Sequence, residues 1–344
     1  FNFTLRQPMG VIAAITPWNF PFLIACWKVA PALAAGNSVV LKPASLTPLT
    51  ALLLGQLAQE AGLPDGVLQV LPGAGSEAGN ALATHPLVRK ISFTGSTEVG
   101  SKIMKLAADD IKRVSLELGG KSPNIVFADA DWQRAAAESP MSVFANTGQD
   151  CCARSRMFIE QPIFNDFVNQ FVAATESLKI GDPTNDETQI GPMVSAAQRE
   201  ISESFVVKAR DAGRDIRTGG ERQGEHGFYL NPAVITGVEI GDRAWREEIF
   251  GPVVCLRPFT DEAKMLREVN DTNFGLSGSI WSNDLSRALR VARQVESGVI
   301  SINTHSSVHT EAPFGGFKRS GLGRDLGMSA MEACTEVKNI YVGE

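Results

Sequence analysis

The chain has 344 residues and a formal net charge of −6 at pH 7, and hydrophobic and charged residues make up 44% and 20% of it. This composition is that of an ordinary globular protein, and the length exceeds what one hydrophobic core usually holds, which predicts two domains. The acidic balance, without lysine- or arginine-rich blocks, argues against nucleic acid and anionic membranes as partners.

Strand-like runs alternate with helical patterns through the first third of the chain. The sequence predicts strands at Val11–Ile15, 38–41, 67–71 and 90–93, and helices at 22–35, 49–61 and 76–84. Such alternation is typical of βαβ units around a parallel sheet buried on both faces. The longest apolar stretch, 22–41, is interrupted by Lys28 and Pro31, so we expect a buried helix and strand there and no membrane span.

Two adjacent glycines, Gly119 and Gly120, close this section, and we place a hinge there. Beyond them the sequence predicts helices at Trp132–Phe144, 164–178 and 196–212, and strands at 124–127, 253–257, Ser277–Trp281, Val299–Ile302 and 336–342. The pattern therefore indicates two α/β domains, with the second built on a sheet of its own.

The cysteines and histidines indicate whether the chain has disulfides or a metal site. An odd number of cysteines in a long chain does not suit a disulfide framework and indicates a reducing compartment, so we expect a cytoplasmic protein. The four histidines form no HExxH motif and have no CxxC partner, so we expect no metal site.

Cys151 is a candidate nucleophile. It follows Gly148, Gln149 and Asp150, a run that suits a turn leading to an exposed helix N-terminus, where the pKa of a thiol is lowered. From the residues alone, a pair of inert core cysteines, Cys151 and Cys152, is the commoner arrangement.

Glu117 is a candidate general base. Its carboxylate lies in an apolar run directly before Leu118 and the two glycines. Burial would raise its pKa toward the range useful for proton abstraction, and the glycines would let the side chain move. An exposed glutamate on an edge strand is an equally open interpretation.

Several segments, in register along nearly the whole chain, resemble the aldehyde dehydrogenase superfamily. Residues 117–123 (Glu-Leu-Gly-Gly-Lys-Ser-Pro) resemble its glutamate signature and residues 148–151 (Gly-Gln-Asp-Cys) its cysteine signature. Further matching segments are 17–21, 41–45, 93–97, 247–252 and 313–318. The resemblance outweighs the two alternatives above. It implies an aldehyde dehydrogenase-like α/β fold, with a parallel-sheet cofactor domain, an α/β catalytic domain and a C-terminal oligomerisation strand.

The resemblance also implies domain limits. These are a bridging segment at 1–8, part of an NAD(P)-binding domain at 9–119, a catalytic domain at 120–330 and an oligomerisation segment at 331–344. Family members carry a sizeable region before the segment that resembles residues 6–10, so we expect this chain to be part of a longer protein. A homodimer or homotetramer is expected, because the last segment resembles an inter-subunit strand.

The resemblance implies a role for particular residues in each step of aldehyde oxidation. The Cys151 thiolate attacks the aldehyde, and the Asn19 side chain and the Cys151 backbone N–H bind the resulting oxyanion. Hydride passes to the cofactor, and Glu117 activates the water that hydrolyses the thioester. Lys28 with Glu336 resembles a pair that relays protons, although a structural ion pair is an equally open interpretation.

The cofactor is expected to be NAD or NADP. The resemblance places its pyrophosphate at the turn of Gly95 and Ser96, which opens a helix, and its adenosine ribose at Lys42. Other candidate cofactor positions are Trp18, Glu248, Phe250 and Gly75, the last in a segment (73–79) that matches GxGxxG only in part. Ser45 stands where NAD-preferring relatives often have glutamate. Because serine does not repel a 2′-phosphate, we expect NADP to be accepted.

The substrate is expected to be a small-molecule aldehyde, of medium aliphatic or aromatic type. The resemblance implies mostly apolar pocket walls, from Phe22, Ile24, Cys26, Trp27, Phe144, Ala145, Asp150, Cys152 and residues 305–311. Asp150 would favour a cationic aldehyde, unless it caps a following helix. His305 and His309 are expected to be loop residues. Alternative functions are a cofactor-independent thiol esterase and an inactive fragment.

Overall fold

The computed structural model describes residues 1–344, which form two compact units. Unit 1 comprises Phe1–Leu118 and Val308–Glu344, and unit 2 comprises Gly119–Ser307. The chain thus passes from one unit to the other at the glycine pair. Residues 308–330, which we expected in the second domain, belong to unit 1. No helix combines the length and the apolar character that a membrane crossing requires.

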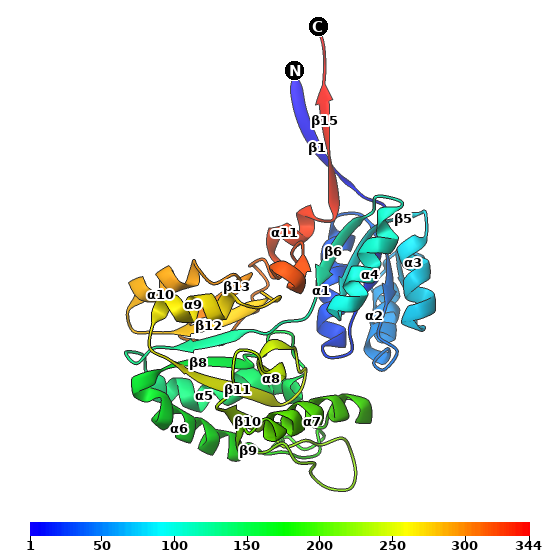
Figure 1. Ribbon diagram of the computed structural model, residues 1–344. Helices are drawn as coiled ribbons and strands as arrows, with labels where there is room; N and C mark the ends of the chain where they lie inside the picture. Colours follow the sequence, from blue (N-terminus) through cyan, green and yellow to red (C-terminus); the bar gives the residue numbers. More distant parts are fainter. The chain divides into compact units, whose positions relative to one another are not determined.

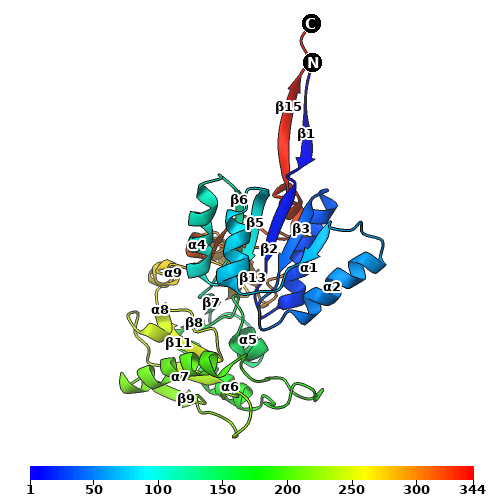
Figure 2. The same cartoon turned by 90° about the vertical axis from the view of Figure 1, so that its right-hand side faces the viewer.

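Unit 1 is built on a six-stranded sheet with the order β14-β6-β5-β2-β3-β4. Figure 1 labels β5 and β6 of this sheet, and Figure 2 labels β2 and β3 beside them. In chain order its strands are β2 (Val11–Ile15), β3 (Ser38–Lys42), β4 (Leu68–Val70), β5 (Val88–Thr94), β6 (Arg113–Glu117) and β14 (Gly321–Leu322). Only β14 runs antiparallel to its neighbour, and the other pairings are parallel. The predicted parallel sheet is therefore present.

The helices of unit 1 follow the predicted alternation. They are α1 (Pro21–Ala34), α2 (Leu49–Glu60), α3 (Asn80–Thr84), α4 (Thr97–Ala108) and α11 (Gly327–Glu332), with a short helical turn at η4 (Lys318–Ser320). The helix predicted at 76–84 is divided into a π-helical turn, η1 (Gly75–Gly79), and α3. Glycines at both ends of that turn weaken a regular α-helix there.

The strand order of unit 1 reverses between β2 and β5. The chain runs outward from β2 through β3 to β4 and then returns to place β5 on the other side of β2. Ile15 pairs with Phe93, so the segments that follow these two strands leave from neighbouring strand ends. In parallel α/β sheets, ligands bind outside the carboxyl ends of the strands at such a reversal.

A two-stranded ribbon extends from unit 1 and carries both chain ends (Figures 1 and 2). It pairs β1 (Asn2–Pro8) antiparallel with β15 (Thr335–Tyr341). The terminal strand was predicted at 336–342, whereas β1 was expected only as a bridging segment. The sequence of β1 has no clear alternation of apolar and polar residues. Such an alternation is absent because both faces of the ribbon are largely exposed.

Unit 2 contains a seven-stranded sheet with the order β13-β12-β7-β8-β11-β10-β9, most of whose strands are labelled in Figure 1. Its strands are β7 (Pro123–Val126), β8 (Arg156–Glu160), β9 (Asp215–Thr218), β10 (Ala233–Thr236), β11 (Val253–Phe259), β12 (Ser277–Trp281) and β13 (Val299–Ile302). Only β9 is antiparallel to its neighbour.

Helices accompany this sheet in unit 2. They are α5 (Trp132–Phe144), α6 (Phe164–Glu176), α7 (Ala196–Asp211), α8 (Arg243–Arg246), α9 (Glu262–Asn270) and α10 (Leu285–Ala292), with short 3-10 turns η2 (Ala145–Gly148) and η3 (Gln161–Ile163). Alternate residues of the central strands belong to two separate core clusters: in β11, Val253 and Cys255 belong to one cluster and Val254 and Leu256 to the other. This period of two is that of a sheet covered on both faces.

Candidate active site

The carboxyl ends of the parallel strands of unit 1 carry most of the predicted cofactor positions. Trp18 and Asn19 follow β2, Lys42 ends β3 and Ser45 follows it, Gly75 follows β4, Gly95 and Ser96 follow β5, and Glu117 ends β6. Because these strands are parallel neighbours, the residues share one edge of the sheet, which includes the reversal of strand order.

The N-terminus of α4 lies at this edge. Ser96 is its N-cap, and the Ser96 hydroxyl accepts a hydrogen bond from the Val99 N–H at 3.3 Å. The Gly95 N–H donates to the Glu117 carbonyl at 3.0 Å, and a Cβ at Gly95 would overlap with the Phe93 ring. Free backbone N–H groups and the helix dipole at such a terminus favour an anion. The geometry of this turn therefore suits a phosphate group.

Lys42 and Ser45 shape the neighbouring strand end. The Lys42 ammonium is buried, donates to the Pro43 carbonyl at 2.8 Å, and has its pKa lowered by burial. The exposed Ser45 hydroxyl donates to the Gly73 carbonyl at 3.1 Å and so ties the loop after β3 to the loop after β4. By contrast, a Cβ at Gly75 would meet open space, so the packing there does not require glycine.

Glu117 is buried, with only 4% of its surface exposed. Its strand, β6, has β5 on one side and β14 on the other, and Glu117 itself pairs with Gly321. The alternative of an exposed glutamate on an edge strand is therefore wrong. The carboxylate also lies close to the backbone of Gly315, where a Cβ would overlap with its Oε1.

Lys28 has a different partner from the one predicted. Its Nζ lies 2.8 Å from Oδ2 of Asp325 and donates to the Ser92 hydroxyl at 3.1 Å. Glu336 lies on the exposed ribbon and pairs with Arg113 at 3.0 Å. The predicted Lys28–Glu336 pair is therefore wrong. Lys28 lies on the buried face of α1, away from solvent. A buried ammonium group needs a buried carboxylate as its partner, because an unpaired buried charge is costly.

In unit 2 the predicted residues precede strands rather than follow them. Cys151 lies before β8, Glu248 and Phe250 lie before β11, and the glycine pair lies before β7. Since β7, β8 and β11 are parallel neighbours, these segments share the amino edge of the seven-stranded sheet.

The glycine pair packs tightly within this edge. The Gly120 N–H donates to Oε1 of Glu248 at 2.9 Å. A Cβ at Gly119 would overlap with the Glu248 carboxylate, and a Cβ at Gly120 would overlap with the Cys151 carbonyl oxygen. Close packing therefore requires both glycines, whereas the sequence had suggested that they give Glu117 freedom to move.

Glu248 and the neighbouring Lys121 are two buried charged groups whose pKa values are shifted by burial. Burial raises the pKa of Glu248 to about 7, against the opposing effects of the Gly120 N–H and the Lys121 ammonium. Lys121 is itself buried, and burial lowers its pKa to about 8. Lys121 lies within the glutamate signature, but nothing in the sequence indicated a role for it.

The loop that carries Cys151 is fixed by the rest of its signature. Asn146, Thr147 and Gly148 all have positive φ angles, of 50°, 58° and 68°. The Gln149 side chain accepts the Val194 N–H at 2.8 Å and donates to the Asn146 carbonyl at 3.1 Å. Gly148 and Gln149 of the signature thus position the loop.

Cys151 lies in a turn and not at a helix N-terminus, so that prediction is wrong. Its thiol is partly exposed, and its pKa is raised well above the usual value by hydrogen bonding to the Cys152 thiol, by burial and by nearby negative charge. The Asp150 carboxylate accepts the Cys152 N–H at 2.8 Å. Because extended chain and then β8 follow, Asp150 does not cap a helix.

Arg154, which the sequence reasoning missed, holds this turn in place. Its guanidinium is almost fully buried. It donates to the carbonyl oxygens of Cys152 and His305 and to the hydroxyls of Ser277, Ser279 and Ser307. The available signal was an arginine three residues after Cys151, just beyond the cysteine signature. His305 lies in a loop as expected, and burial lowers its pKa to about 4, so it is neutral near pH 7.

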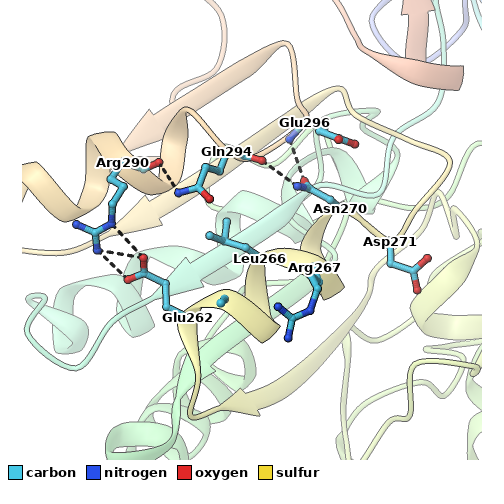
Figure 3. Close-up of a pocket in the computed structure, with 9 residues that line it drawn as sticks. Glu262, Leu266, Arg267, Asn270, Asp271, Arg290, Gln294 and Glu296 are labelled. Carbon is cyan, nitrogen blue, oxygen red and sulfur yellow. Dashed lines mark hydrogen bonds and ion pairs between the residues drawn. The ribbon is translucent and has the colours of Figure 1, made fainter.

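Figure 3 shows a groove of about 780 Å³ on unit 2, formed by α9 and the region of α10. It is lined by Glu262, Ala263, Leu266, Arg267, Asn270, Asp271, Arg290, Gln294 and Glu296, none of which was predicted as a site residue. A second hollow, of about 520 Å³, is lined in part by Glu248. Of these two hollows, only the second borders a predicted residue.

Comparison with known proteins gives a consistent result. A family model described as the aldehyde dehydrogenase family matches residues 1–340. The chain is 46% identical to peroxisomal aminoaldehyde dehydrogenase 2 of Pisum sativum, over 99% of the chain and 68% of that protein. It is 46% identical to phenylacetaldehyde dehydrogenase of Pseudomonas fluorescens, over 98% of the chain and 68% of that protein.

Solved structures agree with this. The NAD-dependent aldehyde dehydrogenase from Sinorhizobium meliloti has a TM-score of 0.98 and 42% identity, covering 99% of this chain and 68% of that one. The betaine aldehyde dehydrogenase from Staphylococcus aureus, in complex with NAD+, has a TM-score of 0.96 and 38% identity, covering 98% of this chain and 68% of that one.

Proposed function

The chain belongs to the aldehyde dehydrogenase family, and on that basis we propose that it carries the catalytic part of an enzyme that oxidises an aldehyde to a carboxylic acid with NAD or NADP. The observation that carries the proposal is the carboxyl edge of unit 1. There Asn19 and Glu117 lie at the same sheet edge as a helix N-terminus suited to phosphate.

The residues of this edge fit a nicotinamide dinucleotide. The α4 N-terminus with Gly95 and Ser96 would hold the pyrophosphate, and the Lys42 ammonium would hold the adenosine ribose. Trp18 would line the same site, and in unit 2 Glu248 and Phe250 would hold the nicotinamide end. When bound, the cofactor supplies the acceptor for the hydride of the aldehyde.

The chemistry assigned to the chain begins with the Cys151 thiol. After it loses its proton, the sulfur attacks the carbonyl carbon, and the Asn19 amide and the Cys151 backbone N–H stabilise the oxyanion. Loss of hydride leaves a thioester on Cys151. Glu117 then takes a proton from water, the hydroxide attacks the thioester, and the carboxylic acid leaves with regeneration of the thiol.

A finer proposal concerns the substrate. The partly exposed Asp150 carboxylate lies directly beside the nucleophile and would favour an aldehyde with a cationic group. The relatives are named for aminoaldehydes, betaine aldehyde and phenylacetaldehyde, which leaves charged and aromatic aldehydes as the classes to compare.

We also propose that the ribbon of β1 and β15 joins subunits of a homodimer or homotetramer. An isolated two-stranded ribbon is marginally stable, and Val337 and Tyr341 expose apolar surface on it. A cytoplasmic location stays a prediction, supported by five unpaired cysteines.

Formation of reduced cofactor by the full-length protein tests the main proposal. Aliphatic, aromatic and amino-substituted aldehydes would be offered with NAD and with NADP. We expect turnover with at least one aldehyde and none after Cys151→Ala. Equal turnover in Cys151→Ala would overturn the assigned nucleophile, and ester hydrolysis without any aldehyde oxidation would favour the thiol esterase alternative.

A further inference from the structure

Three consecutive residues of unit 2, Asp150, Cys151 and Cys152, bring potential ligand atoms together. A carboxylate oxygen and the two sulfur atoms all lie within 4.8 Å of one another. The Cys152 backbone N–H donates to the Asp150 carboxylate, which holds the first and third of these residues together. The proposed reaction uses only the sulfur of Cys151 as a nucleophile, and it gives the Cys152 thiol no part.

The backbone of this cluster is held firmly. The Cys152 N–H donates to the Asp150 carboxylate at 2.8 Å, and the Cys152 carbonyl accepts from the buried Arg154 guanidinium. Arg154 is anchored in turn by the Ser279 hydroxyl of β12 at 2.9 Å. The three side chains therefore need only rotate about their own bonds to close on a common point.

The types of ligand atom determine which metal ions this cluster would bind. Thiolates prefer soft or borderline cations such as Zn²⁺ and Cd²⁺, and a carboxylate completes a common set with them. A tetrahedral zinc with Zn–S bonds of about 2.3 Å places its two sulfurs about 3.8 Å apart. The present upper limit of 4.8 Å is only slightly longer, so small side-chain rotations suffice.

The local charge suits a divalent cation. The two thiolates and the carboxylate would carry three negative charges. The positive charge of Arg154 opposes them, and the nearby carboxylate of Glu248 adds to them. A divalent cation would therefore offset most of the negative charge, which a partly buried group of like charges favours. The sequence predicted no metal site because the known metal motifs are spaced along the chain, and three consecutive ligands match none of them.

We propose that Asp150, Cys151 and Cys152 form an inhibitory binding site for a soft divalent cation, with water as the fourth ligand. As the metal–sulfur bonds form, both S–H bonds break and two protons pass to solvent, and no electron is transferred. Binding stands on the geometry of this cluster alone. The inhibition rests on the proposed function, because a metal-bound Cys151 sulfur cannot attack an aldehyde.

Titration of the full-length protein with Cd²⁺ tests the site, followed by the ultraviolet charge-transfer band of cadmium bound to thiolate. We expect one Cd²⁺ per chain at this site and a loss of affinity of about tenfold or more in Cys152→Ser and in Asp150→Asn. Cys26→Ser is the matched control, because Cys26 is a partly exposed free thiol outside the cluster. Unchanged affinity in either cluster variant would overturn the three-ligand site.

A second measurement needs no variant. In the wild type, Cd²⁺ should protect both Cys151 and Cys152 from iodoacetamide while Cys26 keeps its own rate, and a chelator should reverse the protection. Protection of Cys151 alone would contradict the proposal. If Cd²⁺ binds here and turnover persists, the inhibitory role fails. If the protein has no turnover but binds Cd²⁺ here, the proposed function fails and the metal site stands.

Discussion

The Nζ of Lys28 lies 2.8 Å from the carboxylate of Asp325, and both side chains are almost entirely buried. Breaking a buried pair by removing one charge leaves the other without compensation, which costs about 3–5 kcal/mol. We therefore expect Asp325→Asn to lower the free energy of unfolding by that amount in urea denaturation. Glu336→Gln is the control, because its pair with Arg113 is about half exposed and should contribute about 0–1 kcal/mol. Equal losses in the two variants would contradict the assignment.

The packing of the glycine pair predicts a sharp intolerance at Gly120. A Cβ there would overlap with the Cys151 carbonyl oxygen, so Gly120→Ala must displace the turn that carries the nucleophile. We expect a loss of about 1–3 kcal/mol of stability together with a large fall in kcat. Gly241→Ala is the matched control, because its Cβ would meet open space. Wild-type kcat in Gly120→Ala would show that the turn is not packed in this way.

The protonation of Cys151 predicts a pH dependence. Its pKa is raised above the usual value of 9.0, so near neutral pH the cofactor-free protein holds a protonated thiol. Only the thiolate reacts with iodoacetamide, and below the pKa its fraction grows about tenfold per pH unit. Alkylation of Cys151, followed by mass spectrometry, should therefore still be rising at about pH 9. A rate that levels off below about pH 8 would show a lowered pKa instead.

The side chain at position 45 predicts the choice of cofactor. The exposed Ser45 hydroxyl is bound to the Gly73 carbonyl and carries no charge to repel a 2′-phosphate. Ser45→Glu should lower kcat/KM for NADP by about tenfold or more, while kcat/KM for NAD changes much less, because like charges at close range repel. Ser45→Gln, of similar size but neutral, is the control. If Ser45→Gln and Ser45→Glu lower kcat/KM for NADP equally, the size of the side chain and not its charge determines the cofactor preference.

Local patterns predicted the elements of the fold well. The helix α5 and the strands β12 and β13 begin and end at the predicted residues, because their apolar periodicity and flanking turn residues are local properties. The strands β8, β9 and β10 were not predicted. Arg156, whose charge obscured the apolar pattern of β8, is buried only because its guanidinium donates to the Lys121 and Val269 carbonyls, which no local pattern reveals.

The site was predicted to a different extent. The signatures singled out Cys151, Glu117 and the strand-end positions because each signature is contiguous, and the structure places Glu117 and the strand-end positions at one sheet edge. The predicted partner of Lys28 was wrong. Its actual partner, Asp325, lies far along the chain, and only the packing of the folded protein brings the two residues together. The surroundings of Cys151 were also wrong in part. A turn clamped by Arg154 replaces the expected helix N-terminus, and the adjacent Cys152 thiol raises the pKa that a helix would have lowered.

The thioester itself gives the most direct test of the proposed function. Glu117→Gln in the full-length protein should still accept an aldehyde at Cys151 but hydrolyse the product slowly. After mixing with an aldehyde and NAD or NADP, intact-protein mass spectrometry should show one acyl group, mapped to Cys151, that does not form without cofactor. An acyl group on another residue, or undiminished turnover of Glu117→Gln with no acyl group at all, would contradict the assigned roles of Cys151 and Glu117.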